Sequence, residues 1–126
     1  MKLDYLDNIN EYGESIVRLS DFDKLQAGKF RDIIQRIILE DKNQLDLGKF
    51  DFIKPVNCSL ILRLTDEDIG ITTSDKKYFF CDLTISGYKN MIDLIEPFCN
   101  KESHGYQWLY EIDNPIDLLF SAGGSW

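Results

Sequence analysis

The sequence predicts a small α+β domain, in which an antiparallel sheet of about four to six strands has two helices packed on one face. Two segments carry apolar residues at helical spacing, and several short segments alternate apolar and polar residues as strands do. Short polar breaks separate most of these strands, which favours antiparallel neighbours because parallel pairing requires a long crossover. With 126 residues and no Pro-, Gly- or Ser-rich linker, the chain is expected to form a single domain, residues 1–126.

The first predicted helix spans about residues 21–41. Its apolar side chains recur at positions i, i+3, i+4, i+7 and i+8, and they are Phe30, Ile33, Ile34, Ile37 and Ile38. Ser20 followed by Asp23 resembles a capping box, with Asp in place of the usual Glu, and marks the start of the helix. Before it, residues 1–20 hold no single period, and only residues 14–20 suggest a short strand.

Strands are expected in the middle and in the last part of the sequence. Aliphatic or alternating segments predict them at residues 58–65, 69–73, 78–85, 106–112 and 116–121. A further short strand at residues 50–54, before Pro55, is an open alternative. The segment TDED at residues 65–68, which contains three adjacent acids, is interpreted as a solvated turn, because a calcium loop needs spaced oxygen ligands around a central Gly and a closing Glu.

A second helix is predicted at about residues 87–99. Its apolar stripe consists of Tyr88, Met91, Ile92 and Ile95. Ser86 is the expected N-cap, since a hydroxyl can accept a hydrogen bond from the first turn. Pro97 is expected to kink or end the helix, because proline lacks the backbone N–H.

The formal net charge of −8, from 14 Lys and Arg against 22 Asp and Glu, limits the classes of partner. It argues against nucleic acid and anionic membranes as direct ligands, since both attract clustered cations. It fits a basic protein partner, and it fits solubility alone. The sequence shows no apolar signal core and no run of about 20 apolar residues, so we expect a cytoplasmic protein.

No catalytic residue, metal ligand or cofactor site is predicted. The three cysteines are widely spaced, without a CxxC or a Cys/His cluster, which indicates neither disulfides nor zinc. His104 is the single histidine and is expected to be exposed in a loop, beside Glu102 and Ser103. Cys81 could pair with His104 as a nucleophile, but its aromatic and aliphatic neighbours predict a buried, inert thiol.

Two stretches carry a family resemblance: YFFCDLTISGYKNMIDLIEPF, a strand leading into a helix, and GYQWLYEIDNPIDLLFSAGGSW, two strands with a glycine-containing tail. Together they resemble small bacterial immunity proteins encoded beside polymorphic toxins. The resemblance covers roughly the C-terminal third of the chain. It implies a cytoplasmic inhibitor that masks a toxin domain, and it transfers no site residues, because such families share none. The negative charge of this chain favours a basic toxin domain.

An inhibitor of this type needs an acidic face and aromatic anchors rather than an active site. The expected partner-binding residues are Trp108, Tyr110, Glu111, Asp113 and Asp117, together with the N-terminal Asp4, Asp7 and Glu11. The aromatic side chains at 106, 108 and 110 alternate on one predicted face, which could instead pack under a helix. Trp126 is predicted to be buried against the domain, where it would hold the end of the chain.

Two alternatives from other classes remain open at this point. One is an enzyme or small-ligand domain that uses the His104 loop; a deep apolar pocket with His104 in its wall would support it. The other is a homo-oligomeric structural subunit that buries its aromatic strand in a dimer.

Overall fold

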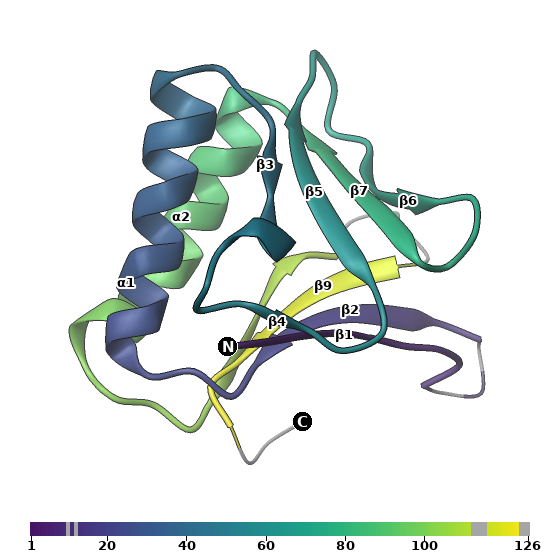
Figure 1. Cartoon of the computed structure of the whole chain (residues 1–126), viewed down its shortest axis with the longest axis horizontal. Helices are drawn as coiled ribbons and strands as arrows, with labels where there is room; N and C mark the ends of the chain where they lie inside the picture. The colour runs from purple at the N-terminus through teal and green to yellow at the C-terminus, as the bar shows by residue number, and fades with distance from the viewer. Residues whose placement is uncertain (10, 12, 112–115, 124–126) are drawn as a thin grey trace.

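Two mixed β-sheets and a pair of adjacent helical segments make up the fold (Figure 1). The computed structural model describes residues 1–9, 11, 13–111 and 116–123. The predicted α+β class is confirmed by this arrangement. The predictions for Asp113 and Trp126 lie outside the described residues.

The larger sheet has five strands in the order β4-β1-β2-β9-β8. In chain order its strands are β1 (Lys2–Leu6), β2 (Ser15–Ser20), β4 (Lys54–Pro55), β8 (Tyr106–Tyr110) and β9 (Ile116–Ser121). Strands β1 and β2 are antiparallel, as are β8 and β9, whereas β2 and β9 are parallel. The sheet therefore joins β2, from the N-terminal part of the chain, to β9, from the C-terminal part, and leaves β8 at one edge.

The smaller sheet has four strands in the order β3-β5-β7-β6. They are β3 (Leu45–Asp46), β5 (Ser59–Leu64), β6 (Gly70–Thr73) and β7 (Tyr78–Leu83). A short 3₁₀ segment, η2 (Leu47–Lys49), follows β3. Strands β5 and β7 are parallel neighbours, because β6, which lies between them in sequence, pairs at the edge beside β7.

The strands are thus divided between two sheets with parallel pairs, where we expected one antiparallel sheet. Short breaks correctly predict that β6 and β7 are antiparallel, but they cannot show that β6 lies outside the β5–β7 pair. Strand β1 is an additional element that the apolar spacing of residues 1–20 does not reveal. The alternative strand at 50–54 is reduced to β4, which begins at Lys54 and pairs in parallel with β1.

Both predicted helices are present within a few residues of their expected bounds. The first is α1 (Lys24–Ile33), which continues as a π-helical segment, η1 (Ile34–Glu40), and the second is α2 (Ile85–Asn100). They lie side by side on one flank of the molecule, where Arg31 Nη1 and Glu96 Oε1 are 2.9 Å apart (Figure 1). Pro97 lies in the last turn of α2 and does not end the helix at once.

The predicted caps of both helices were wrong by a few residues. The N-cap of α1 is Asp23, which forms a capping box with Gln26, whereas Ser20 belongs to β2. The N-cap of α2 is Thr84, whose hydroxyl accepts a hydrogen bond from the Gly87 N–H. Both N-caps have an extended backbone that lets the side chain reach the first turn.

A continuous apolar core lies between the helices and the two sheets. Phe120 of β9 stacks on Phe22 with ring centroids 4.1 Å apart and meets Phe98 edge-on at 5.1 Å. Tyr88 of α2 is fully buried, and its hydroxyl lies 2.7 Å from the carbonyl oxygens of Arg63 and Cys81. The core therefore ties α2 to strands β5 and β7.

Candidate functional site

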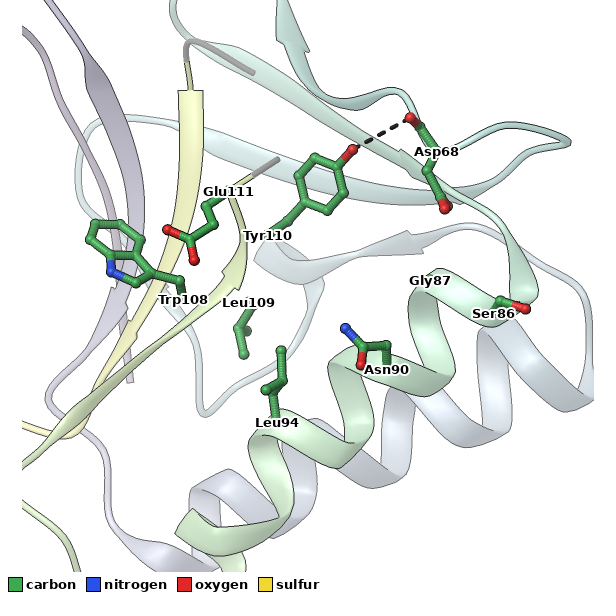
Figure 2. Close-up of a pocket in the computed structure, with 9 residues that line it drawn as sticks. All are labelled: Asp68, Ser86, Gly87, Asn90, Leu94, Trp108, Leu109, Tyr110 and Glu111. Atoms are coloured by element: carbon green, nitrogen blue, oxygen red, sulfur yellow. Dashed lines mark hydrogen bonds between the residues drawn. The ribbon is translucent and has the colours of Figure 1, made fainter. Parts of the chain in front are cut away.

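A cleft of about 270 Å³ opens between the N-terminal half of α2 and the end of edge strand β8 (Figure 2). Its described lining residues are Asp68, Ser86, Gly87, Asn90, Leu94, Trp108, Leu109, Tyr110 and Glu111. Three of them, Trp108, Tyr110 and Glu111, are residues that the sequence predicts for partner binding. The cleft is therefore the candidate functional site.

One wall of the cleft is formed by a single face of α2. Ser86, Asn90 and Leu94 are spaced at i, i+4 and i+8, so they share one face of α2. Figure 2 shows Leu94 facing Leu109 of β8, with Asn90 beside it. Leu109 is only 3% exposed and forms an apolar floor. The predicted apolar stripe of α2 did not include Ser86 and Asn90, although their spacing beside it could have indicated a second, polar face.

A β-bulge sets the direction of the aromatic side chains on β8. Trp108 pairs with Leu119 and Tyr110 pairs with Leu118, so two residues of β8 lie opposite one residue of β9. Tyr110 consequently packs against the core together with Leu109, and in Figure 2 its ring is turned towards Asp68 while the Trp108 indole is turned away from α2. The expected single aromatic face of residues 106, 108 and 110 was therefore wrong.

Asp68, in the loop between β5 and β6, closes the cleft at the start of α2. Its Oδ1 accepts hydrogen bonds from the Thr84 N–H at 2.8 Å and from the Thr84 hydroxyl at 2.9 Å. Its carbonyl oxygen accepts a long hydrogen bond of 3.4 Å from the Tyr110 hydroxyl. Although Asp68 is exposed, as expected for a solvated turn, these contacts join three separate segments around the cleft.

Gly87 makes this contact sterically feasible. A Cβ at position 87 would lie 2.7 Å from Asp68 Oδ1 and 3.0 Å from Leu83 Cβ. Cβ contacts of this length are too close for any residue with a side chain unless its neighbours shift. Glycine at this position therefore allows the Asp68 carboxylate to approach the first turn of α2.

Sheet pairing gathers acidic residues next to the cleft. The end of β1, the starts of β2 and β9, and the end of β8 all lie at one end of the larger sheet. We call this region the acidic end; it contains Asp7, Glu11, Glu14, Glu111 and Asp117. The parallel pairing of β2 with β9 thus brings together acids from the N-terminal and C-terminal parts of the chain.

Asp117 experiences this concentration of negative charge directly. Burial is the main cause that raises its pKa to about 6, and the nearby Glu14 and Glu111 raise it further. Its Oδ1 atom is buried and has no hydrogen-bond partner among the residues that the structure describes. The carboxylate form of Asp117 is therefore held in an unfavourable environment at neutral pH.

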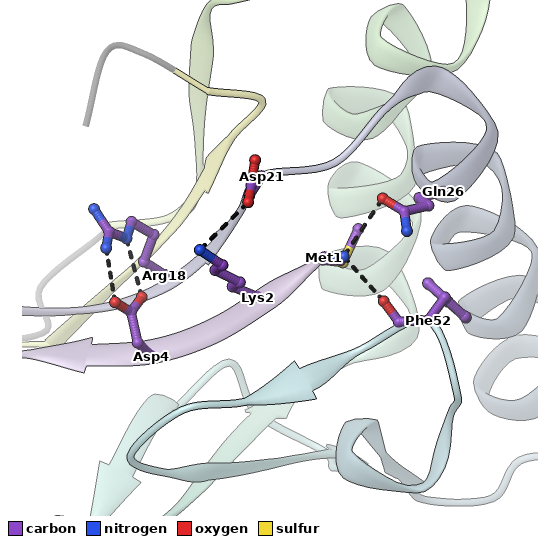
Figure 3. A network of polar contacts seen from close by, with 7 residues as sticks. All are labelled: Met1, Lys2, Asp4, Arg18, Asp21, Gln26 and Phe52. Atoms are coloured by element: carbon purple, nitrogen blue, oxygen red, sulfur yellow. Dashed lines mark hydrogen bonds and ion pairs between the residues drawn. The ribbon is translucent and has the colours of Figure 1, made fainter.

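The remaining N-terminal acids are held by neighbouring side chains. Asp4 receives two hydrogen bonds from Arg18, at 2.7 and 3.0 Å, on the larger sheet away from the cleft (Figure 3). Near it, Lys2 and Asp21 form an ion pair of 3.4 Å, and the Met1 nitrogen lies 3.0 Å from the Phe52 carbonyl oxygen. Asp4 is not among the residues that line the cleft, and its charge is paired with Arg18.

Asp7 is partly compensated by its neighbours. It accepts a hydrogen bond of 2.8 Å from the Ser15 hydroxyl and forms a 3.4 Å ion pair with Lys76. The Ser15 hydrogen bond is the main cause that lowers the pKa of Asp7, and Lys76 adds to it. Glu11 is exposed in the connection between β1 and β2.

The other chemically interesting residues lie elsewhere. His104 is exposed in the loop before β8, at the opposite end of that strand from Glu111, and it is not among the residues that line the cleft. Cys81 is fully buried, and burial raises the pKa of its thiol to about 12, as expected for an inert core cysteine. Within the described residues, no group of three or more His, Cys, Asp or Glu is placed to hold a metal ion.

No protein-family model matches this sequence, and comparisons with curated proteins and with solved structures found no significant match. None of the helices in the described part of the chain has the length and apolar character that crossing a bilayer requires.

Proposed function

We propose that this chain is a cytoplasmic protein-binding module of the immunity type, which masks a basic toxin domain by occlusion. One observation carries the proposal: acids from two remote segments gather at one end of the larger sheet, beside a cleft with aromatic and apolar walls. The net charge of −8 adds a favourable long-range field for a basic partner.

Occlusion needs the combination of features found at this end of the molecule. Complementary charge increases the rate at which two proteins meet, and it also disfavours wrong partners. A few buried aromatic or apolar anchors then slow dissociation. The acidic end supplies the first property, and the cleft with Tyr110 and Leu109 supplies the second.

The test begins with a tagged chain isolated from its native host, after which the captured protein is purified and the complex reconstituted. We expect a one-to-one complex in which the activity of the partner is blocked. Its association rate should fall as the salt concentration rises, because Asp7, Glu11, Glu14 and Glu111 of the acidic end are exposed and therefore screened.

A pair of matched variants separates the acidic end from net charge in general. Glu11→Gln combined with Glu14→Gln should slow association by about tenfold at low salt. Glu40→Gln combined with Asp51→Asn removes the same charge from exposed sites outside the acidic end and should change the rate much less. Equal effects of the two pairs would contradict the proposed surface.

Two further results would overturn the proposal as a whole. A stable homodimer that buries β8, measured by sedimentation of the pure protein, would favour the structural-subunit alternative. Turnover of a small molecule by a chain that reconstitutes with no protein partner would favour the enzyme alternative.

A further inference from the structure

The size of the α2–β8 cleft indicates what kind of group it can hold. Sites for small-molecule ligands enclose roughly 300–1,000 Å³, whereas this cleft encloses about 270 Å³. It therefore lies at the lower limit for such ligands, and it is large enough to receive one long side chain of a protein partner. Buried pockets that each receive one anchoring side chain are a usual feature of protein interfaces.

The residues that line the cleft indicate which type of side chain it can receive. Two carboxylates, Asp68 and Glu111, contribute to the wall, and the described lining residues include no Lys, Arg or His. Leu94 and Leu109 offer an apolar surface along which the methylene stem of a long cationic side chain can lie. The ring of Tyr110 adds a face that attracts cations.

The start of α2 does not reverse the preference of the cleft for a cationic side chain. A helix N-terminus ordinarily attracts anions through its unpaired N–H groups. Here the Asp68 carboxylate already accepts from the Thr84 N–H, and the Gly87 N–H is bonded to the Thr84 hydroxyl. An acid of this chain therefore already compensates the positive end of the helix.

Apolar residues beside the cleft extend the contact surface. Ile69 follows Asp68 and is 50% exposed, and Ile85 follows Thr84 and is 39% exposed. Because Asp68 and Thr84 are hydrogen-bonded to each other, both isoleucines flank the start of α2. A partner segment with a cation between apolar side chains would match this surface in both charge and polarity.

We propose that the cleft between α2 and β8 is an anchor pocket for one arginine side chain of the protein partner. This inference rests on the proposed function, because it names the group of the partner that the surface recognises. Arginine fits better than lysine because its planar guanidinium carries five N–H donors in a fixed geometry. Asp68 and Asn90 offer oxygens near the start of α2, whereas Glu111 lies on the other side of Tyr110 and adds negative charge to the wall (Figure 2).

The pocket can be tested with a single blocked amino acid. Amide chemical shifts of the ¹⁵N-labelled chain are followed during titration with N-acetyl-arginine amide. We expect saturable shifts at Gly87, Asn90 and Leu109, with a Kd in roughly the millimolar range, as suits a ligand of this size. N-acetyl-citrulline amide, the uncharged isostere, should bind at least about fivefold more weakly, and N-acetyl-glutamate amide should produce no saturable shifts at these residues.

Two variants locate the site. Glu111→Gln should weaken binding of the arginine probe several-fold, whereas Glu67→Gln, an exposed neighbour of Asp68 outside the cleft lining, should leave it unchanged. Leu94→Lys places a competing cation on the wall and should abolish the shifts. An otherwise conserved amide spectrum shows in each case that the variant is folded.

The inference is overturned if citrulline binds as well as arginine, if glutamate binds in the cleft, or if the arginine shifts occur only at Glu11 and Glu14. Such a result leaves the proposed function standing when the reconstituted complex still forms and remains sensitive to salt. Conversely, arginine binding in the cleft without any protein complex would overturn the proposed function, and it would leave an arginine-binding cleft with no partner to supply the side chain.

Discussion

Gly87 has the most constrained position around the candidate site. The Asp68 carboxylate approaches the place where a side chain would begin, and Leu83 approaches it from a second direction. The residue therefore couples the acidic loop between β5 and β6 to the first turn of α2. A side chain here would push Asp68 away from Thr84.

Replacing Gly87 with alanine should lower the free energy of unfolding by about 1 kcal/mol, because the added methyl group displaces the Asp68 carboxylate from its hydrogen bonds to Thr84. Gly28→Ala is a matched control, since its Cβ would meet nothing nearer than Arg31 Nη2 at 4.0 Å. The free energy of unfolding of Gly28→Ala should rise by about 0.5–1 kcal/mol, because alanine is the better helix former. Urea unfolding of both proteins measures the difference, and equal changes would contradict the steric argument.

Asp117 should make stability depend on pH in an unusual direction. Its folded pKa of about 6 lies above the ordinary value of 3.8, so the folded state binds the proton more tightly than the unfolded state does. Its contribution to stability is complete below pH 3.8 and is lost as pH rises through 6. Asp117→Asn should therefore be more stable than the parent protein at pH 7.5, by about 1 kcal/mol after solvent screening.

Urea unfolding between pH 3.5 and 7.5 measures this effect, and the advantage of Asp117→Asn should shrink as the pH falls. Asp75 provides a control of opposite sign. Hydrogen bonds from the backbone N–H groups of Tyr78 and Lys77 lower its pKa, so its contribution is present above pH 3.8 and is lost at lower pH. Asp75→Ala should accordingly lose stability at neutral pH, and the loss should narrow on acidification. A pH-independent effect of Asp117→Asn would contradict the environment assigned to this carboxylate.

At the scale of elements, the start of α1 offers a direct comparison between two cap assignments. Asp23→Ala should lower the free energy of unfolding by about 1 kcal/mol, because the Gln26 N–H loses its 2.8 Å hydrogen bond. Ser20→Ala should cost little, since Ser20 is a strand residue that makes no cap. Thermal unfolding distinguishes the two, and a larger loss for Ser20→Ala would restore the assignment made from sequence.

The helices could be predicted from the sequence because their signal is local and repeated. Phe30, Ile33 and Ile34 already define the buried side of α1, and only the cap is ambiguous, since both Ser20 and Asp23 are good capping residues. The bulge at Leu109 could not be predicted. It inserts one residue without a glycine to mark it, and it changes which side of the sheet receives Tyr110.

At the scale of the whole molecule, Tyr88 joins α2 to the smaller sheet. Its buried hydroxyl lies between two strand carbonyls, and burial is the main cause that raises its pKa far above the usual range. Tyr88→Phe should lower the free energy of unfolding by about 1–2 kcal/mol, because the two carbonyl oxygens lose the single buried O–H donor that they share. Tyr78→Phe, at a residue that is 58% exposed, should be nearly neutral in the same urea titration.

The candidate site could be predicted only in part, because some of its residues come from segments that are remote in sequence and meet only in the whole fold. Trp108, Tyr110 and Glu111 were expected together because they are close in sequence. Asp68 was assigned to a solvated turn, since no local pattern shows that its loop meets α2. The meeting of Glu14 with Asp117 depends on the pairing of β2 with β9, and pairing between remote strands leaves no periodic signal in either segment.

That same pairing constrains how the protein can be made. On the ribosome, β2 emerges early, but its central neighbour β9 is absent until residues 116–121 have been synthesised. Until then the nascent chain carries a strand edge and apolar side chains such as Ile16 and Leu19 without their final partners. Formation of the larger sheet must therefore wait until residues 116–121 have emerged, and closing so long a loop slows it further. A chain whose translation stops before residue 116 is expected to aggregate rather than fold.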